Sequence, residues 1–413
     1  MSLFSWWKKP TNLGLALDIG TEFVKALIFE AKDDKAQIIG SGRIRQQLGQ
    51  MQGGMVRDIK GVIQTSEKAI EEAEKEAQAS ADKAIIGIAG ELIKGATTNV
   101  HYTRLDPEKE ITFKELAKII RRVQEEAFNQ AREMLAEETG YSSVEVKLVN
   151  SAIVVVKIDG YKVNNPIGFK GKEVMVGVFN AFAPLVHLGA LQTIADELGL
   201  DILSIAVEPY SVARAFVEEG DFSAIFIDIG GGTTDVAVVR KGGVEGTKMF
   251  ALGGRAFTNR LAQELSLSFT EAEKVKLKYS AGNLSKDLRE KVKIALARDV
   301  EVWSEGLNLA LEEFTEGELL PSRIYLCGGG SLLPEIKEIL SKGEWRKGLP
   351  FAREPKVEFS SLKNVASVID KTAKLSAPED ITPASLASLS LELIGEEPVL
   401  DEVLNQAVKA LRT

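Results

Sequence analysis

The sequence predicts an α/β fold of two related halves, with a small α+β module inserted into the first half. Three observations predict it. An apolar strand, Asp-Ile-Gly, a tight turn and a second apolar strand occur twice, in LALDIGTEFVKALIF and IFIDIGGGTTDVAVV. Strand and helix patterns alternate on either side of these hairpins. Residues 96–184 interrupt that alternation with a pattern of their own.

Composition narrows the classes of function. A chain of 413 residues is longer than one hydrophobic core usually serves, so two or more domains are expected. A net charge of −9 argues against a general nucleic-acid surface. The single cysteine, Cys327, excludes an internal disulfide, and the two histidines, His101 and His187, give little support to a zinc site. No apolar run reaches the roughly 18 residues that would span a bilayer.

The elements of the first half follow from periodicity. Residues 14–29 read as strand, glycine turn and strand, and residues 84–90 as a short buried strand. Apolar residues near helical spacing predict a helix over 59–78. After the module, we expect a helix over 186–198, a strand over 201–209 and a helix over 211–220.

The inserted module is predicted from one helix and two strands. The helix covers 112–137, and Thr112 with Glu115 three residues later is typical of a helix start. Strand-like runs cover 144–160 and 172–184.

The second half repeats the strand–turn–strand hairpin of the first half and adds helices. Residues 223–242 read as strand, turn and strand, 255–315 as helical, and 323–340 as strand, glycine turn and helix. The predicted domains are an aromatic and basic segment (1–12), a first lobe (13–95 and 185–221), the module (96–184), a second lobe (222–370) and a tail with an amphipathic helix (371–413).

The second hairpin carries residues suited to a phosphate. Glycines allow backbone N–H groups to approach an anion closely, and Thr233 adds a hydroxyl. The hairpin glycines are Gly230, Gly231 and Gly232. Asp228 would repel a phosphate directly, so it is better suited to hold Mg²⁺ through water.

The first hairpin matches it with Asp18, Gly20 and Thr21, and Lys25 on the returning strand can reach a phosphate. Two such hairpins facing each other would clamp one triphosphate between two domains. The alternative is a pair of ordinary glycine hairpins, with Lys25 facing solvent. A third glycine turn, 328–330, precedes a helix whose N-terminus can bind an anion or a ribose. The fingerprints of a Rossmann site and of a P-loop are absent.

Taken together, the motifs resemble those of known protein families. DIGT, VEPYSVARAF, IDIGGGTTD, ALGG and CGGGSLLPEI resemble the nucleotide motifs of the actin/Hsp70/hexokinase superfamily. GGMVRDIKGVIQTSEKAIEEAE, AIIGIAGELIKG and NPIGFKGKEVMVGVFNAFAP resemble the bacterial cell-division protein FtsA, and the similarity covers about 14–340. It implies an actin-like two-lobed ATPase fold (two RNase H-like halves) with an SHS2-like α+β insert. The pilus-assembly protein PilM shares this architecture and is the close rival.

The resemblance implies roles for residues. Asp18 and Asp228 would hold Mg²⁺ through water beside ATP. The groups around the phosphates would be Gly20, Thr21, Lys25, Gly230, Gly231, Gly232 and Thr233. Gly328, Gly329 and Gly330 would lie against the adenosine. Glu273 and Lys276 match a segment that reaches the ribose and base, or they form an exposed helix face.

Glu208 would orient the attacking water and complete a catalytic set with Asp18 and Asp228. FtsA proteins commonly have a non-acidic residue at this position, so Glu208 is a departure toward PilM and the bacterial actin MreB. The alternative interpretation is a strand-end acid before Pro209.

The implied function is that of an ATP-binding, self-associating cell-division protein that links FtsZ filaments to the inner face of the cytoplasmic membrane, with slow or regulatory hydrolysis. A PilM-like scaffold of a pilus or secretion assembly is the second hypothesis. A sugar or acetate kinase is the third, but no set of sugar-binding polar residues is evident.

The first residues suggest how such a protein could reach a membrane. Phe4, Trp6 and Trp7 can insert at the headgroup level, and Lys8 and Lys9 can meet anionic lipid. Docking to a partner protein and packing on the first sheet are the alternatives. The tail helix would gain little from anionic lipid, because it has no aromatic residue and its polar face carries Asp401 and Glu402 as well as Lys409 and Arg412. Its other face is apolar and can pack on its own body or on a partner. That face consists of Leu400, Val403, Leu404, Ala407, Val408 and Leu411.

Overall fold

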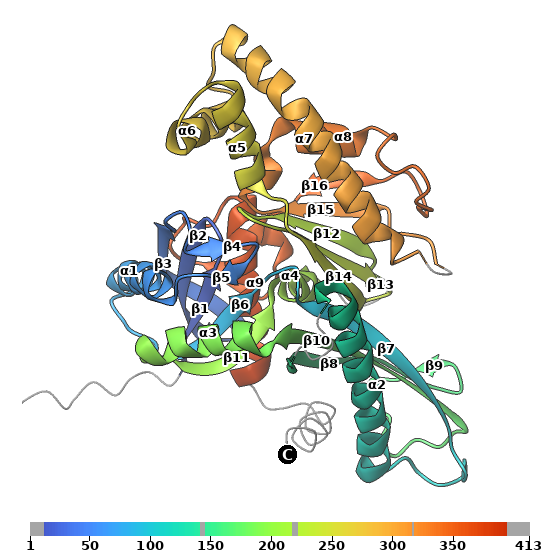
Figure 1. The fold of residues 1–413 in the computed structure, drawn as a ribbon. Coiled ribbons are helices and arrows are strands. Elements are labelled where there is room, and N and C mark those ends of the chain that lie inside the picture. Colours follow the sequence, from blue (N-terminus) through green and yellow to red (C-terminus); the bar gives the residue numbers. More distant parts are fainter. Residues whose placement is uncertain (1–11, 141–144, 217–221, 316–317, 395–413) are drawn as a thin grey trace, which may run out of the picture.

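The protein folds into two α/β lobes and an α+β module (Figure 1), which confirms the predicted fold class. The structure is a computed structural model and describes residues 12–140, 145–216, 222–315 and 318–394. The segment 1–11 and the predicted tail helix therefore lie outside the described residues.

The first lobe is organised around a mixed sheet. In the described ranges this sheet has six strands, in the order β11-β6-β1-β2-β3-β17. They are β11 (Asp201–Val207), β6 (Lys83–Ile88), β1 (Leu13–Ile19), β2 (Phe23–Lys32), β3 (Lys35–Arg45) and β17 (Val368–Asp370). β1 runs antiparallel to β2 and parallel to β6, and every residue of β1 is buried, as expected for a central strand.

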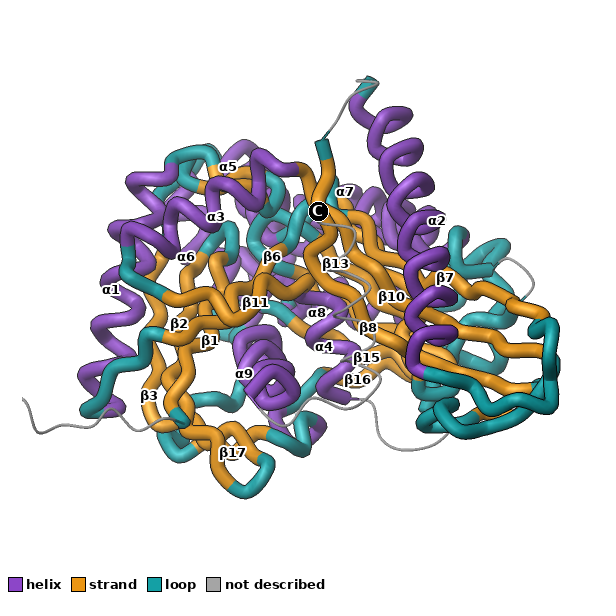
Figure 2. Tube along the Cα trace, turned by 90° about the horizontal axis from the view of Figure 1, so that it is seen from below, coloured by secondary structure: helices purple, strands orange, loops and turns teal. Residues whose placement is uncertain are grey.

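Helices cover both sides of this sheet. Figure 2 shows α1 (Ile59–Ala77) and α9 (Ile381–Ile394) on opposite sides of the strands. α1 approaches β3 closely because Gly42 has no side chain: a Cβ there would lie 1.9 Å from the Ala69 carbonyl oxygen. α1 confirms the helix predicted over 59–78, with Asp58 accepting from the Gly61 N–H at its start.

α3 (Leu185–Glu197) and α4 (Glu208–Phe216) flank β11 in the chain. The predicted strand over 201–209 is too long, because the strand ends at Val207 and α4 begins at Glu208. The reason is local: a proline fits the first turn of a helix, and Pro209 is the second residue of α4.

A second, longer sheet joins the second lobe to the module. Within the described residues it has nine strands, in the order β16-β15-β12-β13-β14-β7-β10-β8-β9. They are β16 (Lys356–Phe359), β15 (Arg323–Cys327), β12 (Ala224–Ile229), β13 (Thr234–Arg240), β14 (Gly243–Phe250), β7 (Lys94–Thr103), β10 (Glu173–Pro184), β8 (Val146–Ile158) and β9 (Tyr161–Lys162). The lobe and the module meet where β14 pairs with β7, at Gly246 opposite Ala96 and Thr247 opposite Gly95.

The buried clusters do not follow the three parts strictly, because the cluster of the first lobe also includes residues of the second sheet such as Phe179 and Phe226. In the module, α2 (Phe113–Thr139) packs on the sheet, and its predicted start is confirmed, because the Thr112 side chain accepts from the Glu115 N–H. In the second lobe, four helices contribute to one buried cluster that includes the fully buried Trp303 of α7, whose indole N–H donates to Thr234 Oγ1 at 2.9 Å. These helices are α5 (Gly254–Glu264), α6 (Phe269–Ser280), α7 (Lys286–Glu312) and α8 (Pro334–Ser341). The remaining short elements are β4 (Met51–Gln52), β5 (Met55–Val56), and the 3₁₀ turns η1 (Gly329–Leu332), η2 (Leu362–Asn364) and η3 (Pro378–Asp380).

The end of the described chain returns to the first lobe. β17 pairs with β3, with Val368 opposite Ala36, although these residues fall in the range expected for the second lobe. α9 then packs on the first core through Ile381, Ala384 and Leu386. α4 and α9 are in contact, so two helices from distant parts of the chain lie together beside the first sheet.

Candidate functional site

The first Asp-Ile-Gly hairpin joins β1 to β2. Asp18 lies directly opposite Lys25 in the strand pair, and the Lys25 ammonium is 3.0 Å from Asp18 Oδ2. Gly20 closes the turn through its N–H to the Phe23 carbonyl at 3.1 Å, and a Cβ on Gly20 would lie 2.8 Å from that oxygen. Lys25 therefore points toward the aspartate and does not face solvent, and its contact with a phosphate stays a prediction.

The second hairpin joins β12 to β13 in the same way. Asp228 lies opposite Asp235, and the Gly230 N–H donates to the Thr233 carbonyl at 2.9 Å. Thr233 also donates its hydroxyl to Asp235 Oδ2 at 3.3 Å.

The two hairpin turns touch each other. A Cβ added to Gly232 would lie 2.7 Å from Thr21 Oγ1, and one added to Gly231 would lie 2.7 Å from the Glu22 Cβ. The predicted facing of the two hairpins is therefore present, with the turns in contact. These glycines allow one turn to approach the other, a use that the sequence analysis did not foresee.

Four carboxylates lie close together behind these turns: Asp18, Glu208, Asp228 and Asp235. The Glu208 side chain lies over Gly87, where an added Cβ would meet Glu208 Oε1 at 2.7 Å, and Gly87 is the cross-strand neighbour of Asp18. Asp18, Glu208 and Asp235 are 3%, 9% and 4% exposed. Sequence reasoning missed Asp235, although its place at the end of IDIGGGTTD, opposite Asp228, was a usable signal.

Burial and mutual repulsion raise the pKa values of three of these carboxylates, Glu208, Asp228 and Asp235. Burial raises the pKa of Glu208 well above its ordinary value, and the charges of Asp18, Asp235 and Asp228 add to the effect. Burial and then Asp228 raise the pKa of Asp235 in the same way. Burial lowers the pKa of Lys25, but Asp18 and Asp228 outweigh it, so the pKa of Lys25 is raised and the ammonium is retained.

The carboxylate group has more negative charge than its neighbours balance. Lys25 is the cation that contributes to the pKa of both Glu208 and Asp228, and the buried oxygen Asp235 Oδ1 has no hydrogen-bond partner among the described residues. A divalent cation fits such a set of oxygens. In the described part of the chain, however, no three acidic, histidine or cysteine side chains converge closely enough to bind a metal directly. Contact through water, as predicted from the sequence, is compatible with both observations.

The third glycine turn lies against the second hairpin. Gly328 has φ +76°, and a Cβ there would lie 2.1 Å from Asp228 Oδ1. Gly330 also lies close to the second hairpin, with an added Cβ 2.9 Å from the Ile229 carbonyl oxygen. All three predicted glycine turns are thus adjacent in the fold.

One segment at this junction was not predicted. The Lys25 ammonium donates to the Glu379 carbonyl at 2.8 Å, and the Gly328 N–H donates to the Pro378 carbonyl at 3.1 Å. Thr382, at the start of α9, donates its hydroxyl to Asp228 Oδ2. The segment 378–382 therefore bridges both lobes at the site, whereas the sequence analysis treated it as part of a tail.

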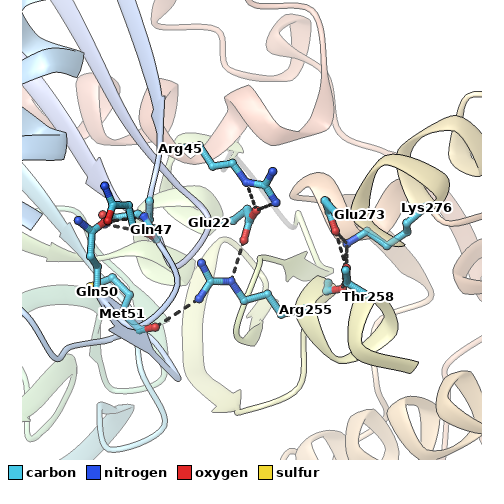
Figure 3. A network of polar contacts seen from close by, with 12 residues as sticks. Glu22, Arg45, Gln47, Gln50, Met51, Arg255, Thr258, Glu273 and Lys276 are labelled. Carbon is cyan, nitrogen blue, oxygen red and sulfur yellow. Dashed lines mark hydrogen bonds and ion pairs between the residues drawn. The ribbon is translucent and has the colours of Figure 1, made fainter. Parts of the chain in front are cut away.

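Glu273 and Lys276 form a buried pair on α6, which excludes the alternative of an exposed helix face. They are 6% and 8% exposed, and Lys276 Nζ lies 2.8 Å from Glu273 Oε2. Lys276 also donates to the Gly254 carbonyl at 2.9 Å and to Thr258 Oγ1 at 2.8 Å (Figure 3). The pair is therefore attached to the start of α5, where the ALGG motif ends at Gly254.

An ion pair connects the lobes beside the hairpins. Glu22 lies in the first turn, and its carboxylate lies 2.7 Å from Arg255 Nε of α5 and 2.6 Å from Arg45 Nη2 of β3 (Figure 3). Arg255 also donates to the Met51 carbonyl at 3.4 Å. Sequence reasoning missed this contact because nothing in the local pattern pairs positions 22 and 255.

The predicted membrane or partner residues, Phe4, Trp6, Trp7, Lys8 and Lys9, lie outside the described residues. Among the helices that the structure describes, none combines the length and the apolar character needed to span a bilayer.

Comparisons with known proteins agree with this architecture. A family model described as "Cell division protein FtsA" matches residues 225–382. The chain is 26% identical to FtsA of Neisseria meningitidis over 356 residues, covering 79% of this chain and 80% of that protein. It is 24% identical to FtsA of Streptococcus pneumoniae over 344 residues, covering 78% of this chain and 72% of that protein.

Solved structures agree on the fold. The structure described as "PilM-PilN type IV pilus biogenesis complex" matches with a TM-score of 0.65 at 19% identity, over 94% of this chain and 100% of that chain. The ethanolamine utilization protein EutJ from Carboxydothermus hydrogenoformans matches with a TM-score of 0.50 at 16% identity, over 93% of this chain and 91% of that chain. The chain thus has the actin-like fold, and the resemblance to the bacterial cell-division protein FtsA that its motifs predicted is confirmed.

Proposed function

We propose that this chain is an ATP-binding, self-associating cell-division protein that links FtsZ filaments to the inner face of the cytoplasmic membrane. The observation that carries the nucleotide part is the meeting of the two Asp-Ile-Gly hairpins at a group of four carboxylates and Lys25. The similarity to FtsA over most of the chain supports the cellular role.

In this proposal, backbone N–H groups of both turns hold the phosphates of ATP. The residues are Gly20, Thr21, Lys25, Gly230, Gly231, Gly232 and Thr233. In the structure, Gly231 lies against Glu22 and Gly232 against Thr21. The two turns would therefore separate slightly to admit phosphate. Asp18 and Asp228 hold Mg²⁺ through water, and the cation offsets the repulsion among the carboxylates.

The remaining groups hold the nucleoside. The glycine turn 328–330 lies against the adenosine, and the Glu273–Lys276 pair reaches the ribose and base. Both are adjacent to the hairpins through Asp228 and Gly254, which supports their assignment to one site. Bound Mg-ATP would supply the γ-phosphate as the group to be cleaved.

Glu208 is the residue we assign to the attacking water. Burial and the neighbouring carboxylates raise its pKa, and a weaker acid is a stronger base toward an attacking water. We expect Glu208→Ala to retain Mg-ATP binding and to lose turnover, measured as phosphate release. Unchanged turnover would remove Glu208 from the mechanism.

Nucleotide state is proposed to set the closure of the two lobes and thereby self-association. The bridging segment 378–382, which contacts Lys25, Gly328 and Asp228, supports this, because closure at the site displaces groups attached to both lobes.

The cellular role is tested by retention of FtsZ on the immobilised full chain with Mg-ATP. Retention supports the proposal. Retention of a pilus inner-membrane component but not of FtsZ would favour the second candidate, a PilM-like scaffold of a pilus or secretion assembly. The acid at position 208, which departs from the FtsA pattern, favours that candidate.

The membrane contact is assigned to Phe4, Trp6, Trp7, Lys8 and Lys9, with the chain peripheral on the inner face of the membrane. Co-sedimentation with anionic vesicles, compared for the full chain and for chains lacking 1–9 or 396–413, tests it. Loss of binding on removal of 1–9 alone is the expected result. Equal binding without 1–9 would contradict it.

A further inference from the structure

A groove of about 380 Å³ lies on the first lobe, away from the hairpins. Its walls are α1 from Ile63 to Glu74, the loop before β6 and the loop between α3 and β11. Its floor is apolar and consists of Ile63, Ile70, Ala81, Leu198 and Leu200. Three of these side chains are only half-buried, so the floor keeps apolar surface open to solvent.

The rim of the groove is acidic. It has five carboxylates, from Glu67, Glu71, Glu74, Asp82 and Glu197, and the described residues that line the groove include no lysine or arginine. An apolar floor with such a rim is complementary to a short segment that carries large apolar side chains and adjacent positive charges.

The chain itself has such a segment, and it is joined to the start of β1. MSLFSWWKKPT leads into β1, which begins at Leu13. β1 runs parallel to β6 with Leu15 opposite Ala84, so two residues earlier Leu13 is level with Asp82 of the rim. Neighbouring strands are about 4.8 Å apart. Residues 1–11, which can extend to roughly 36 Å, therefore start within easy reach of the groove.

We propose that residues 1–11 dock into this groove of their own chain, with Phe4, Trp6 and Trp7 on the apolar floor and Lys8 and Lys9 at the acidic rim. The lipid contact proposed above uses the same side chains, so docking and membrane binding exclude each other. The groove then holds residues 1–11 until anionic lipid competes for them. The docking step itself requires neither nucleotide nor lipid.

Tryptophan quenching in the full chain tests the docking. Trp303 and Trp345 are 0% and 7% exposed, so they are shielded from acrylamide. The difference between the full chain and the Trp6→Phe/Trp7→Phe variant therefore reports Trp6 and Trp7. Docking predicts that these two are quenched far less than in a free peptide of residues 1–11. Equal quenching in the chain and the peptide would overturn the proposal.

Charge reversal identifies the groove as the site. Glu67→Lys/Glu71→Lys should lower the docked-to-free ratio about tenfold, because two attractive ion pairs become repulsive. Glu301→Lys/Glu305→Lys, an exposed pair with the same spacing on α7, makes the same charge change elsewhere and should leave the shielding unchanged. Adding Lys8→Glu/Lys9→Glu to the groove variant should restore shielding. If Trp6 and Trp7 were shielded equally in the intact chain and in Glu67→Lys/Glu71→Lys, the result would count against the proposal.

Two further measurements distinguish docking within one chain from docking on a second copy and from membrane binding. Shielding that disappears on dilution of the intact chain would place the segment on a second copy and contradict docking within one chain. If docking and the membrane proposal both hold, the groove reversal should increase binding to anionic vesicles. Absence of vesicle binding in every variant would count against the membrane contact and leave the quenching result intact as a separate test.

Discussion

The ion pair between Glu22 and Arg255 should contribute measurably to the association of the two lobes. The pair joins the first hairpin to α5 at 2.7 Å, with side-chain exposures of 13% and 15%. Fully exposed pairs contribute about 0.2–1 kcal/mol. Removing one partner of a buried pair costs about 3–5 kcal/mol. The partial exposure places this pair between those limits, and we expect a coupling free energy of about 2 kcal/mol.

A double-mutant cycle with Glu22→Ala and Arg255→Ala, followed by calorimetric unfolding, measures this coupling. Glu22→Ala alone should be the most costly variant, because it leaves Arg45 and Arg255 close together without their shared carboxylate. The matched control is Arg346–Glu354, a pair within the second lobe at 2.6 Å whose exposures are 22% and 76%. A coupling at Glu22–Arg255 no larger than that of the control would refute the idea that this pair holds the lobes together.

Two further predictions concern the hairpins and the carboxylates. Glu208→Gln should stabilise the chain at neutral pH by about 1 kcal/mol, because it replaces a carboxyl whose ionisation is opposed by burial and by its neighbours. A carboxyl whose folded pKa is raised costs stability as the pH rises above its unfolded value near 4.5, so urea unfolding of the variant should show a smaller loss between weakly acidic and neutral pH. An equal loss in both proteins would be contrary evidence. Gly253→Ala should destabilise by about 1–3 kcal/mol, because its Cβ would lie 2.7 Å from a backbone oxygen of the second hairpin. Gly189→Ala on α3 has open space and is the control, so similar unfolding midpoints for the two variants would contradict the close approach.

The parts of the site that are local in sequence were predictable. Asp18 and Lys25 face each other because a two-strand hairpin fixes their register, and the same register places Asp228 opposite Asp235. The repetition of Asp-Ile-Gly indicated two similar halves, and the start of α2 at Thr112 followed from its capping pattern.

The parts that depend on long-range contacts were not predictable. The return of β17 to β3 and the contact of Thr382 with Asp228 join segments more than 150 residues apart, and no local pattern specifies such partners. The ion pair of Glu22 with Arg255 is of the same kind. For Glu208, the sequence indicated the residue and its chemistry, but the end of the strand was misplaced because a proline in the first turn of a helix also looks like the end of a strand.

Calorimetric titration of Mg-ATP into the full chain and into Asp228→Asn tests the nucleotide site most directly. Asp201→Asn, at the exposed start of β11, is the matched control. We expect binding by the intact chain and by the control, and loss of Mg²⁺-dependent binding in Asp228→Asn. Equal Mg-ATP affinity in all three proteins would contradict the assignment of the two hairpins as the nucleotide site.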